Sequence, residues 1–289
     1  FRVIGYDISQ HRIRELKENI DSTKEITKSE LKKAKKLLYT SDKALISEKY
    51  IYIVTVPTPV KNNNSPDLSL LKNACKLVGK NINKKAIIIF ESTVYPGVTE
   101  KICAPIIAKE SKYNLNEDFY LGYSPERINP GDTKHSLDKI IKVVSGSNDK
   151  ITKTIGKIYS KIIKAGIFYA KSIEVAETAK AIENAQRDIN IAFVNEISLL
   201  CQKLNISVYD VLETARTKWN FLPFQPGLVG GHCIGVDPYY LAYIAKKLGS
   251  SADVILSGRR LNDNMTSIIF KKIEKQVSLK SRILQIGIS

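Results

Sequence analysis

Short apolar runs alternate with amphipathic segments over about the first 170 residues. Six of these runs have the length and the Ile, Val, Tyr and Phe content of buried strands: residues 1–8, 50–56, 86–90, 119–123, 140–145 and 167–170. Helical periodicity lies between them, at residues 9–19, 29–38, 68–81 and 149–163 and in a segment through residues 103–108. Strands that alternate with helices predict an α/β fold with a doubly wound, parallel, Rossmann-like sheet, whose ligands bind at the carboxyl ends of the strands.

The pattern becomes helical after residue 171. Periodicity is unbroken over residues 172–204, which corresponds to a helix about 50 Å long at ~1.5 Å per residue. A helix of that length suits a junction between two domains or two subunits. Shorter helices are predicted at residues 208–215, 239–248 and 251–277, and residues 282–288 have the character of a further strand.

These patterns predict three regions along the chain. Residues 1–171 would form an N-terminally incomplete dinucleotide-binding domain, because no glycine-rich GxGxxG turn precedes the first strand. Residues 172–278 would form a helical central domain that carries a candidate nucleophile and makes the subunit contacts. Residues 279–289 would begin a third, truncated domain.

Charge narrows the list of partners. A net charge of +16 is compatible with nucleic acid, an anionic membrane or an anionic small substrate. The lysines are spread through amphipathic segments and form no arginine-rich arm, so we expect solvated faces and no nucleic-acid partner. No apolar run approaches the roughly 20 residues that cross a bilayer, and no secretory signal opens the sequence. We therefore expect a cytoplasmic protein without a membrane partner.

The cysteines and histidines argue against a metal. The four cysteines form no CxxC pair, and the three histidines are equally scattered. The sequence therefore predicts neither a disulfide framework nor a metal site.

The stretch VGGHCIGVDP, at residues 229–238, is the strongest candidate for chemistry. Cys233 follows two glycines that let the backbone approach a bound group, and Asp237 lies four residues further on. A thiolate in such a loop can hold an aldehyde or acyl carbon covalently. The adjacent His232 is a poor base for this thiol, because side chains of neighbouring residues diverge. Alternatively, Cys233 is a small buried hydrophobic residue.

Two polar residues of the long helix are candidate partners for this loop. Lys180 and Asn184 are four residues apart and share one helix face, and Arg187 lies about one turn further on. If that face borders the glycine loop, a cation and an amide donor are aimed at one small volume, where they can stabilise an oxyanion. The alternative is a solvated lysine beside a surface asparagine.

Polar residues also follow the predicted strands. Asp7 ends the first strand, where a dinucleotide-binding domain bonds the adenosine ribose, although it could instead cap the next helix. Glu126 and Arg127 follow a later strand as a candidate base and phosphate ligand, or as an ion pair that braces the loop. Thr93, after another buried strand, could order a water, contact a nicotinamide or cap a helix.

Five motifs occur in this order along the chain: VTVPTP, ESTVYPG, YSPERINPGD, AETAKAIENAQRDINIAFVNE and QPGLVGGHCIGVDPYY. Together they closely resemble the nucleotide-sugar 6-dehydrogenases of the UDP-glucose/GDP-mannose dehydrogenase family, and most of all the branch that oxidises UDP-N-acetylglucosamine or UDP-N-acetylgalactosamine. The resemblance implies two successive oxidations by NAD. The C6 alcohol becomes an aldehyde, a cysteine captures it as a thiohemiacetal, oxidation gives a thioester, and water releases a uronic acid for surface polysaccharide synthesis.

The resemblance also implies roles for particular residues. Cys233 would be the nucleophile, and Lys180 and Asn184 would stabilise the oxyanion. Asp237 would assist proton transfer, while Glu126 and Thr93 would position the hydrolytic water. The NAD site would consist of Asp7, Arg12, Val56, Pro57, Thr58, Ser92 and Thr93. The UDP-sugar would contact Tyr123, Glu126, Arg127, Lys180, Asn184, Arg187, Gly227, Gly230 and Gly231. No metal is implied, and the long helix predicts a homodimer.

The chain departs from the family in three places. The glycine-rich opening turn and the third, nucleotide-binding domain of the family are missing, and Val236 stands where several relatives carry lysine. The alternatives are a UDP-glucose or GDP-mannose 6-dehydrogenase, a hydroxyacid-type dehydrogenase that makes one hydride transfer without a thiol, or a nucleic-acid-binding module. Pocket shape decides which sugar is oxidised, and the motifs do not specify it.

Overall fold

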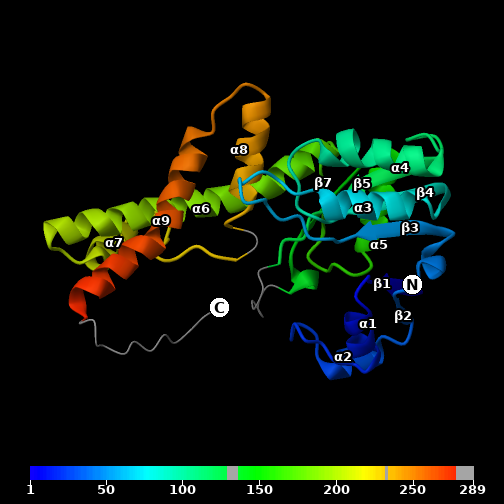
Figure 1. Cartoon of the computed structure of the whole chain (residues 1–289), viewed down its shortest axis with the longest axis horizontal. Helices are drawn as coiled ribbons and strands as arrows, with labels where there is room; N and C mark the ends of the chain where they lie inside the picture. Colours follow the sequence, from blue (N-terminus) through cyan, green and yellow to red (C-terminus); the bar gives the residue numbers. More distant parts are fainter. Residues whose placement is uncertain (129–135, 232–233, 278–289) are drawn as a thin grey trace. The chain divides into compact units, whose positions relative to one another are not determined.

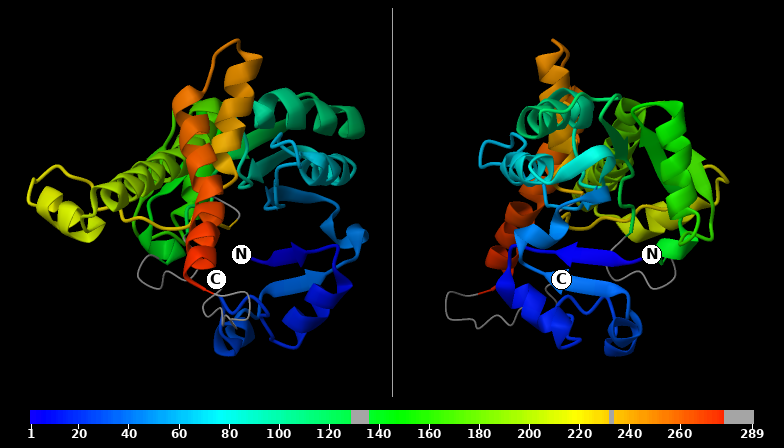
Figure 2. Two further views of the ribbon diagram at one scale, coloured as in Figure 1. Left: turned by 60° about the vertical axis from the view of Figure 1, so that its left-hand side comes forward. Right: turned by 90° about the vertical axis from the view of Figure 1, so that its right-hand side faces the viewer.

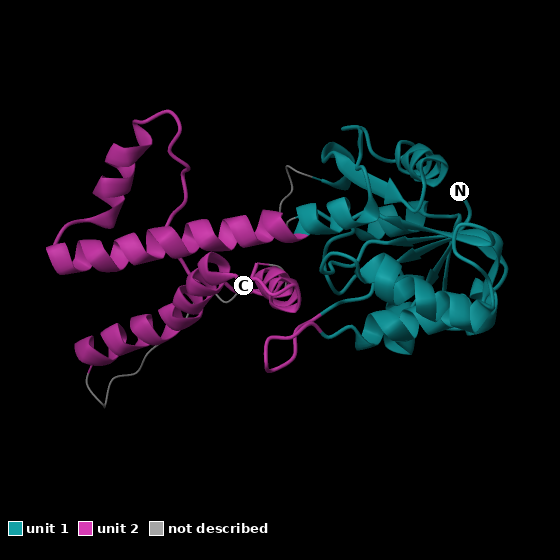
Figure 3. Ribbon diagram, turned by 90° about the horizontal axis from the view of Figure 1, so that it is seen from above, with its two compact units in different colours: residues 1–58, 67–180 teal, residues 59–66, 181–289 magenta. Residues whose placement is uncertain are grey.

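The computed structural model describes residues 1–128, 136–231 and 234–277. The chain divides into two compact units, shown in teal and magenta in Figure 3. Unit 1 consists of residues 1–58 and 67–180, and unit 2 consists of residues 59–66 and 181–289. The boundary between the units at residues 180/181 lies within one continuous helix.

The described residues of unit 1 form two sheets (Figure 1). In the smaller one, β1 (Val3–Tyr6) pairs in parallel with β2 (Leu37–Thr40). The larger has the order β3-β4-β5-β6-β7, with β3 at Lys49–Val54, β4 at Ile82–Phe90, β5 at Phe119–Tyr123, β6 at Lys142–Gly146 and β7 at Ile167–Tyr169. Strands β3, β4 and β5 are parallel, β6 is antiparallel to β5, and β7 is parallel to β6.

Helices cover both faces of the larger sheet. Ile87 and Ile89 of β4 pack with one face of α5 (Asp149–Tyr159), which presents Ile151 and Ile155. Because side chains alternate along a strand, the buried Ile88 points to the opposite face. Figure 2 shows α3 (Ser69–Gly79) and α4 (Ala104–Ser111) on that opposite side. A π-helical turn, η2 (Thr99–Cys103), leads directly into α4.

The predicted doubly wound α/β fold is confirmed, with local differences. The lysine-rich segment at residues 29–38 was predicted to be helical, but α2 (Lys28–Lys33) is shorter, and residues 37–40 form β2. A capping box between Thr27 and Glu30 fixes the start of α2, and pairing with β1 makes the following residues a strand. That pairing is a long-range contact, which local periodicity does not reveal. The strands are parallel within the β1–β2 pair and from β3 to β5, whereas β6 and β7 run opposite to β5.

The described part of unit 1 also contains three short elements. They are α1 (Gln10–Lys17) and the 3-10 turns η1 (Lys43–Ile46) and η3 (Leu137–Lys139).

Unit 2 is helical in its described part. The predicted long helix is confirmed as α6 (Ile173–Leu204), whose first two turns belong to unit 1. It is followed by α7 (Val208–Arg216), α8 (Asp237–Lys247) and α9 (Asp253–Gln276). The strand predicted at residues 282–288 lies outside the described residues. None of the described helices combines the length and the apolar character needed to span a bilayer.

Candidate functional site

The loops after β3 and β4 are joined by two hydrogen bonds at the carboxyl ends of these neighbouring strands. Ser92 Oγ donates to the carbonyl of Val56 at 2.6 Å, and Thr58 Oγ1 donates to the carbonyl of Thr93 at 2.5 Å. Pro57 lies between the two bonded residues of the first loop and is exposed. The structure thus brings together these five residues of the predicted cofactor site, at the edge where a doubly wound sheet binds ligands.

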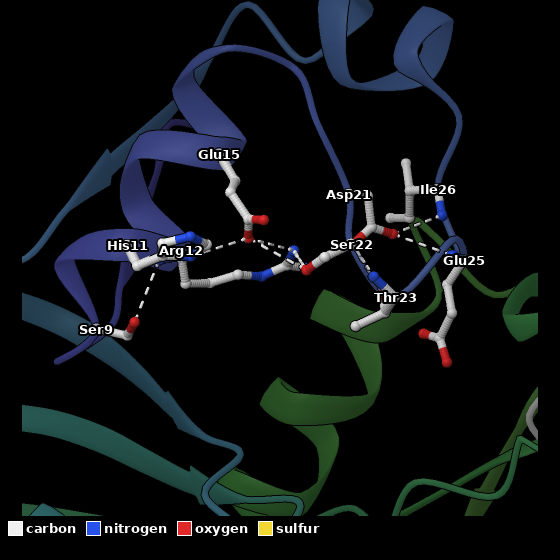
Figure 4. Close-up of polar contacts among 9 residues, drawn as sticks. All are labelled: Ser9, His11, Arg12, Glu15, Asp21, Ser22, Thr23, Glu25 and Ile26. Carbon is white, nitrogen blue, oxygen red and sulfur yellow. Dashed lines mark hydrogen bonds and ion pairs between the residues drawn. The ribbon is translucent and has the colours of Figure 1, made fainter.

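Asp7 directly follows β1, and Arg12 lies in the first turn of α1, where Figure 4 shows its contacts. The Asp7 carboxylate accepts the backbone N–H of Ser9 at 2.7 Å. Ser9, rather than Asp7, is the N-cap of α1, since its Oγ accepts the backbone N–H of Arg12 at 3.2 Å. The alternative that Asp7 caps this helix is therefore wrong. The Arg12 guanidinium donates to Asp21 at 2.6 Å and to Ser22 at 3.1 Å.

Asp21 fixes the loop that holds Arg12. Its side chain is only 3% exposed and accepts the backbone N–H groups of Thr23, Glu25 and Ile26. The hydrogen bond from Arg12, together with these donors, holds the pKa of the Asp21 carboxyl well below its usual range. Arg12 is therefore anchored in place beside the strand end, a feature that the sequence alone did not reveal.

The predicted base Glu126 has partners both in its own loop and in β6. Its Oε1 accepts the backbone N–H groups of Arg127 at 2.6 Å and Ile128 at 2.8 Å. Its Oε2 faces Lys142 Nζ at 3.5 Å. Arg127 donates to the carbonyl of Ile141 at 3.3 Å, so the two side chains have separate partners. Tyr123, the last residue of β5, is fully buried.

Lys142 is a buried cation that sequence reasoning missed. It lies in β6 with 4% of its side chain exposed, 3.2 Å from the carbonyl of Pro125 and 3.4 Å from the Glu91 carboxylate. Tyr159 donates a hydrogen bond to the Glu91 carboxylate, and Lys142 Nζ lies over the aromatic ring of Tyr159. A lysine within the apolar run KIIKVV was the available signal, because a charge in a buried strand needs partners.

Helix α6 carries a stripe of buried polar side chains, which we call the polar stripe. Its members are Glu177, Lys180, Asn184, Asp188 and Asn195, none more than 7% exposed. Their spacings of three, four, four and seven residues place them on one helix face. The predicted pair of Lys180 and Asn184 is thus buried rather than solvated. Arg187 is only partly buried and lies off the stripe.

Within unit 1, the polar stripe holds the loop after β4. The Glu177 carboxylate is fully buried and accepts the backbone N–H groups of Gly97 at 2.5 Å and Thr99 at 2.9 Å. Burial raises the pKa of Glu177 to about 7, and the nearby Glu100 acts in the same direction. Gly97 has a φ of +91°, which a glycine adopts without strain. Glu177 therefore connects α6 to the segment that carries Thr93.

Within unit 2, the polar stripe contacts the start of α8. Asn184 Nδ2 donates to Asp237 Oδ2 at 2.5 Å, and Asp237 is 2% exposed. The structure therefore brings these two predicted catalytic residues together. Gly230 and Gly231 are exposed, and Gly231 has a φ of +80°. Cys233 and His232 lie outside the described residues.

Further along, the polar stripe joins α9. Asp188 is fully buried and accepts hydrogen bonds from Arg259, which is 2% exposed, and from Asn262 Nδ2 at 2.7 Å. Asn262 Oδ1 in turn accepts from Asn195 at 2.9 Å. The other partner of Asn195 is the backbone of Gly227, a predicted substrate residue. Sequence reasoning missed Asp188, Asn195, Arg259 and Asn262.

The fold and these strand ends define a dinucleotide-binding α/β protein with an appended helical unit. The chain belongs to the UDP-glucose/GDP-mannose dehydrogenase family, as two family models show. Residues 1–163 match the NAD binding domain of that family, and residues 174–264 match its central domain. The resemblance deduced from the five motifs is thereby confirmed.

Individual relatives agree with this assignment. The UDP-N-acetyl-D-glucosamine 6-dehydrogenase of Salmonella typhi is 50% identical over 279 residues, 96% of this chain and 66% of that protein. The enzyme of the same name from Pseudomonas aeruginosa is also 50% identical, over 97% of this chain and 66% of its own. The solved structure of UDP-D-ManNAc dehydrogenase from Pyrococcus horikoshii matches with a TM-score of 0.86 at 31% identity, covering 96% of this chain and 67% of that one. The chain thus spans about two thirds of the length of these relatives.

Proposed function

We propose that the protein oxidises the C6 alcohol of a UDP-N-acetylhexosamine to the uronic acid in two NAD-dependent steps. The observation that carries this proposal is the buried hydrogen bond between Asn184 and Asp237. Asp237 lies four residues after Cys233 in the chain. Further support comes from the relatives that are named UDP-N-acetyl-D-glucosamine 6-dehydrogenases. The product would serve surface polysaccharide synthesis.

Four side chains would carry the chemistry. The Cys233 thiolate would attack the C6 aldehyde to form a thiohemiacetal, and the second oxidation would give a thioester. Lys180 would supply positive charge for the developing oxyanion, and Asn184 an N–H donor. The Asn184 amide has two N–H groups, and the contact with Asp237 uses one of them and fixes the orientation of the amide. Asp237 would move a proton to or from the C6 oxygen.

Hydrolysis of the thioester, which releases the uronic acid, would depend on Thr93 and Glu126. The bonds that Glu126 makes to its own backbone and to Lys142 hold one orientation of the carboxylate. Because its orientation is fixed, this carboxylate is suited to holding a water molecule at one position. Tyr123, Arg127, Arg187, Gly227, Gly230 and Gly231 would contact the sugar nucleotide.

The residues at the strand ends fit NAD as the cofactor. Asp7 would accept hydrogen bonds from the adenosine ribose, beside the anchored Arg12. The remainder of NAD would lie against the two loops after β3 and β4, at Val56, Pro57, Thr58, Ser92 and Thr93. The hydroxyl groups of Thr58 and Ser92 hold the backbones of these two loops together. When bound, NAD supplies the hydride acceptor for each oxidation.

Substrate choice can be tested with the full-length protein and four sugar nucleotides. We expect NADH formation with UDP-N-acetylglucosamine or UDP-N-acetylgalactosamine, and much less with UDP-glucose or GDP-mannose. A preference for UDP-glucose or GDP-mannose would support the proposed oxidation but contradict the proposed UDP-N-acetylhexosamine substrate. A complete lack of NADH with all four would contradict the reaction itself.

A homodimer is the proposed assembly, built on unit 2. A groove of about 780 Å³ between α6 and α9 is lined by apolar residues, among them Phe193, Leu200 and Leu261, and by Glu196 and Lys203. Phe193 and Leu200 are at least half exposed. A surface with both apolar groups and charges of both signs can pair with itself about a two-fold axis. Sedimentation of the full-length protein at micromolar concentration should give twice the protomer mass, and a single species of protomer mass would contradict a dimer.

A further inference from the structure

The carboxamide of Asn195 contacts both backbone groups of Gly227. Asn195 Nδ2 donates to the Gly227 carbonyl at 2.9 Å, and the Gly227 N–H donates to Asn195 Oδ1, also at 2.9 Å. A planar amide that bonds both groups of one residue imitates the pairing of two strands. It fixes the position and the orientation of the Gly227 backbone, which one hydrogen bond would not do.

The Asn195 carboxamide is itself held from behind. The residue is fully buried, and its Nδ2 also donates to Asn262 Oδ1 at 2.9 Å. Asn262 Nδ2 donates to the Asp188 carbonyl at 2.9 Å and to the Asp188 carboxylate at 2.7 Å. Both hydrogens of the Asn195 amide therefore have acceptors, and rotation of this amide would break bonds on both sides.

The segment that contains Gly227 has few other attachments. Between residues 222 and 231, the hydrogen bonds to the helices of unit 2 that the described chain shows are both made by Asn195. Among the described residues, and apart from its chain neighbours, a Cβ placed at Gly227, Gly230 or Gly231 would meet no atom within 4 Å. This segment is thus loosely surrounded, and its path depends on the point where Asn195 holds it.

We propose that Asn195 is a positioning residue for the sugar nucleotide: it sets the backbone of Gly227 and so aligns the glycine loop that binds the substrate. The inference rests on the proposed function. It assigns Asn195 no contact with NAD, whose proposed residues lie at the strand ends of unit 1. Loss of Asn195 should therefore weaken binding of one ligand and leave the other nearly unchanged.

The test compares three variants of the full-length protein. Asn195→Ala removes both contacts with Gly227. Asn195→Asp keeps the volume and the acceptor for the Gly227 N–H but loses the donor, so it remains informative if the alanine variant does not fold. Asn190→Ala is the matched control, because Asn190 lies on the same helix, is partly exposed and donates to the carbonyl of Gln186 within that helix.

Two measurements follow, calorimetric binding of UDP-N-acetylglucosamine and of NAD, and hydrogen exchange at the Gly227 amide. For Asn195→Ala we expect the Kd for the sugar nucleotide to rise about tenfold or more, that for NAD to change less than about twofold, and the amide to exchange at least about tenfold faster. Asn195→Asp should fall between wild type and alanine in amide exchange. Asn190→Ala should match the wild type.

The contrary outcomes separate the role of Asn195 from the proposed function. Equal weakening of both ligands, unchanged sugar-nucleotide binding or unchanged exchange at Gly227 would overturn the role of Asn195 while leaving the proposed function intact. A wild-type protein that binds none of the four sugar nucleotides would overturn the proposed function, and the positioning role with it.

Discussion

Replacing Cys233 by serine should abolish formation of the uronic acid. A serine hydroxyl is a far weaker nucleophile than a thiolate at neutral pH, so the aldehyde would not be held for the second oxidation. We expect acid production to fall by a factor on the order of 10³ or more, as is typical when a covalent nucleophile is removed. The acid can be measured by chromatography of the reaction products, with NADH followed in parallel by absorbance.

The control for this substitution is Cys201→Ser. Cys201 is a free cysteine in α6 and is 4% exposed, so its substitution alters a buried position without touching the proposed nucleophile. It should leave the acid yield per NADH unchanged. If Cys233→Ser still formed acid at a rate close to wild type, the covalent mechanism would be wrong, and a single-step dehydrogenase of the hydroxyacid type would become the better description.

Replacing Glu177 by glutamine should change how stability depends on pH. The pKa of Glu177 is raised from 4.5 to about 7 in the folded protein. A raised carboxyl pKa means that the stability it contributes is fully present below about pH 4.5 and is lost as the pH rises through about 7. A pKa shift of this size corresponds to a loss of about 3 kcal/mol in the free energy of unfolding. Glutamine does not ionise, so the variant should lack this loss.

The measurement is equilibrium urea unfolding between pH 5 and pH 8.5. The difference in unfolding free energy, wild type minus Glu177→Gln, should fall by about 3 kcal/mol over this range. The variant also loses one acceptor for the N–H groups of Gly97 and Thr99, which shifts its curve downward by a constant of about 1–3 kcal/mol. Parallel curves for the two proteins would show that Glu177 does not titrate in this range.

A second carboxylate on the same helix provides the control. Glu174 is 50% exposed and pairs with Lys101 at 3.0 Å. Exposed ion pairs contribute little to stability, so Glu174→Gln should keep the wild-type pH profile. A comparison of the two glutamine variants separates the buried carboxylate from the charges around it, which include Glu100 and Lys101.

Much of the fold was predictable because it follows from local patterns. The strand at residues 119–123 and the helix at residues 172–204 were predicted almost to their ends, since a buried apolar run and unbroken helical periodicity are properties of neighbouring residues. Strand β2 was missed because its four residues become a strand only through pairing with β1. The antiparallel direction of β6 is likewise a property of the sheet and not of its own sequence.

The candidate site was predictable in its residues more than in its contacts. The spacing of Lys180 and Asn184 indicated a shared face, and the same face continues to Asp188, four residues further on, and to Asn195, seven residues beyond that. The spacing did not reveal the hydrogen-bond partners that these buried polar groups need. The partners lie 32 to 80 positions away in the chain, as with Gly227 for Asn195 and Gly97 for Glu177.

The most direct test of the central claim is the number of NADH molecules formed per sugar nucleotide consumed by the full-length protein. The proposed mechanism predicts two NADH for each UDP-N-acetylglucosamine or UDP-N-acetylgalactosamine, together with one equivalent of uronic acid. One NADH per sugar, with an aldehyde or ketone as product, would contradict the four-electron mechanism and the role assigned to Cys233.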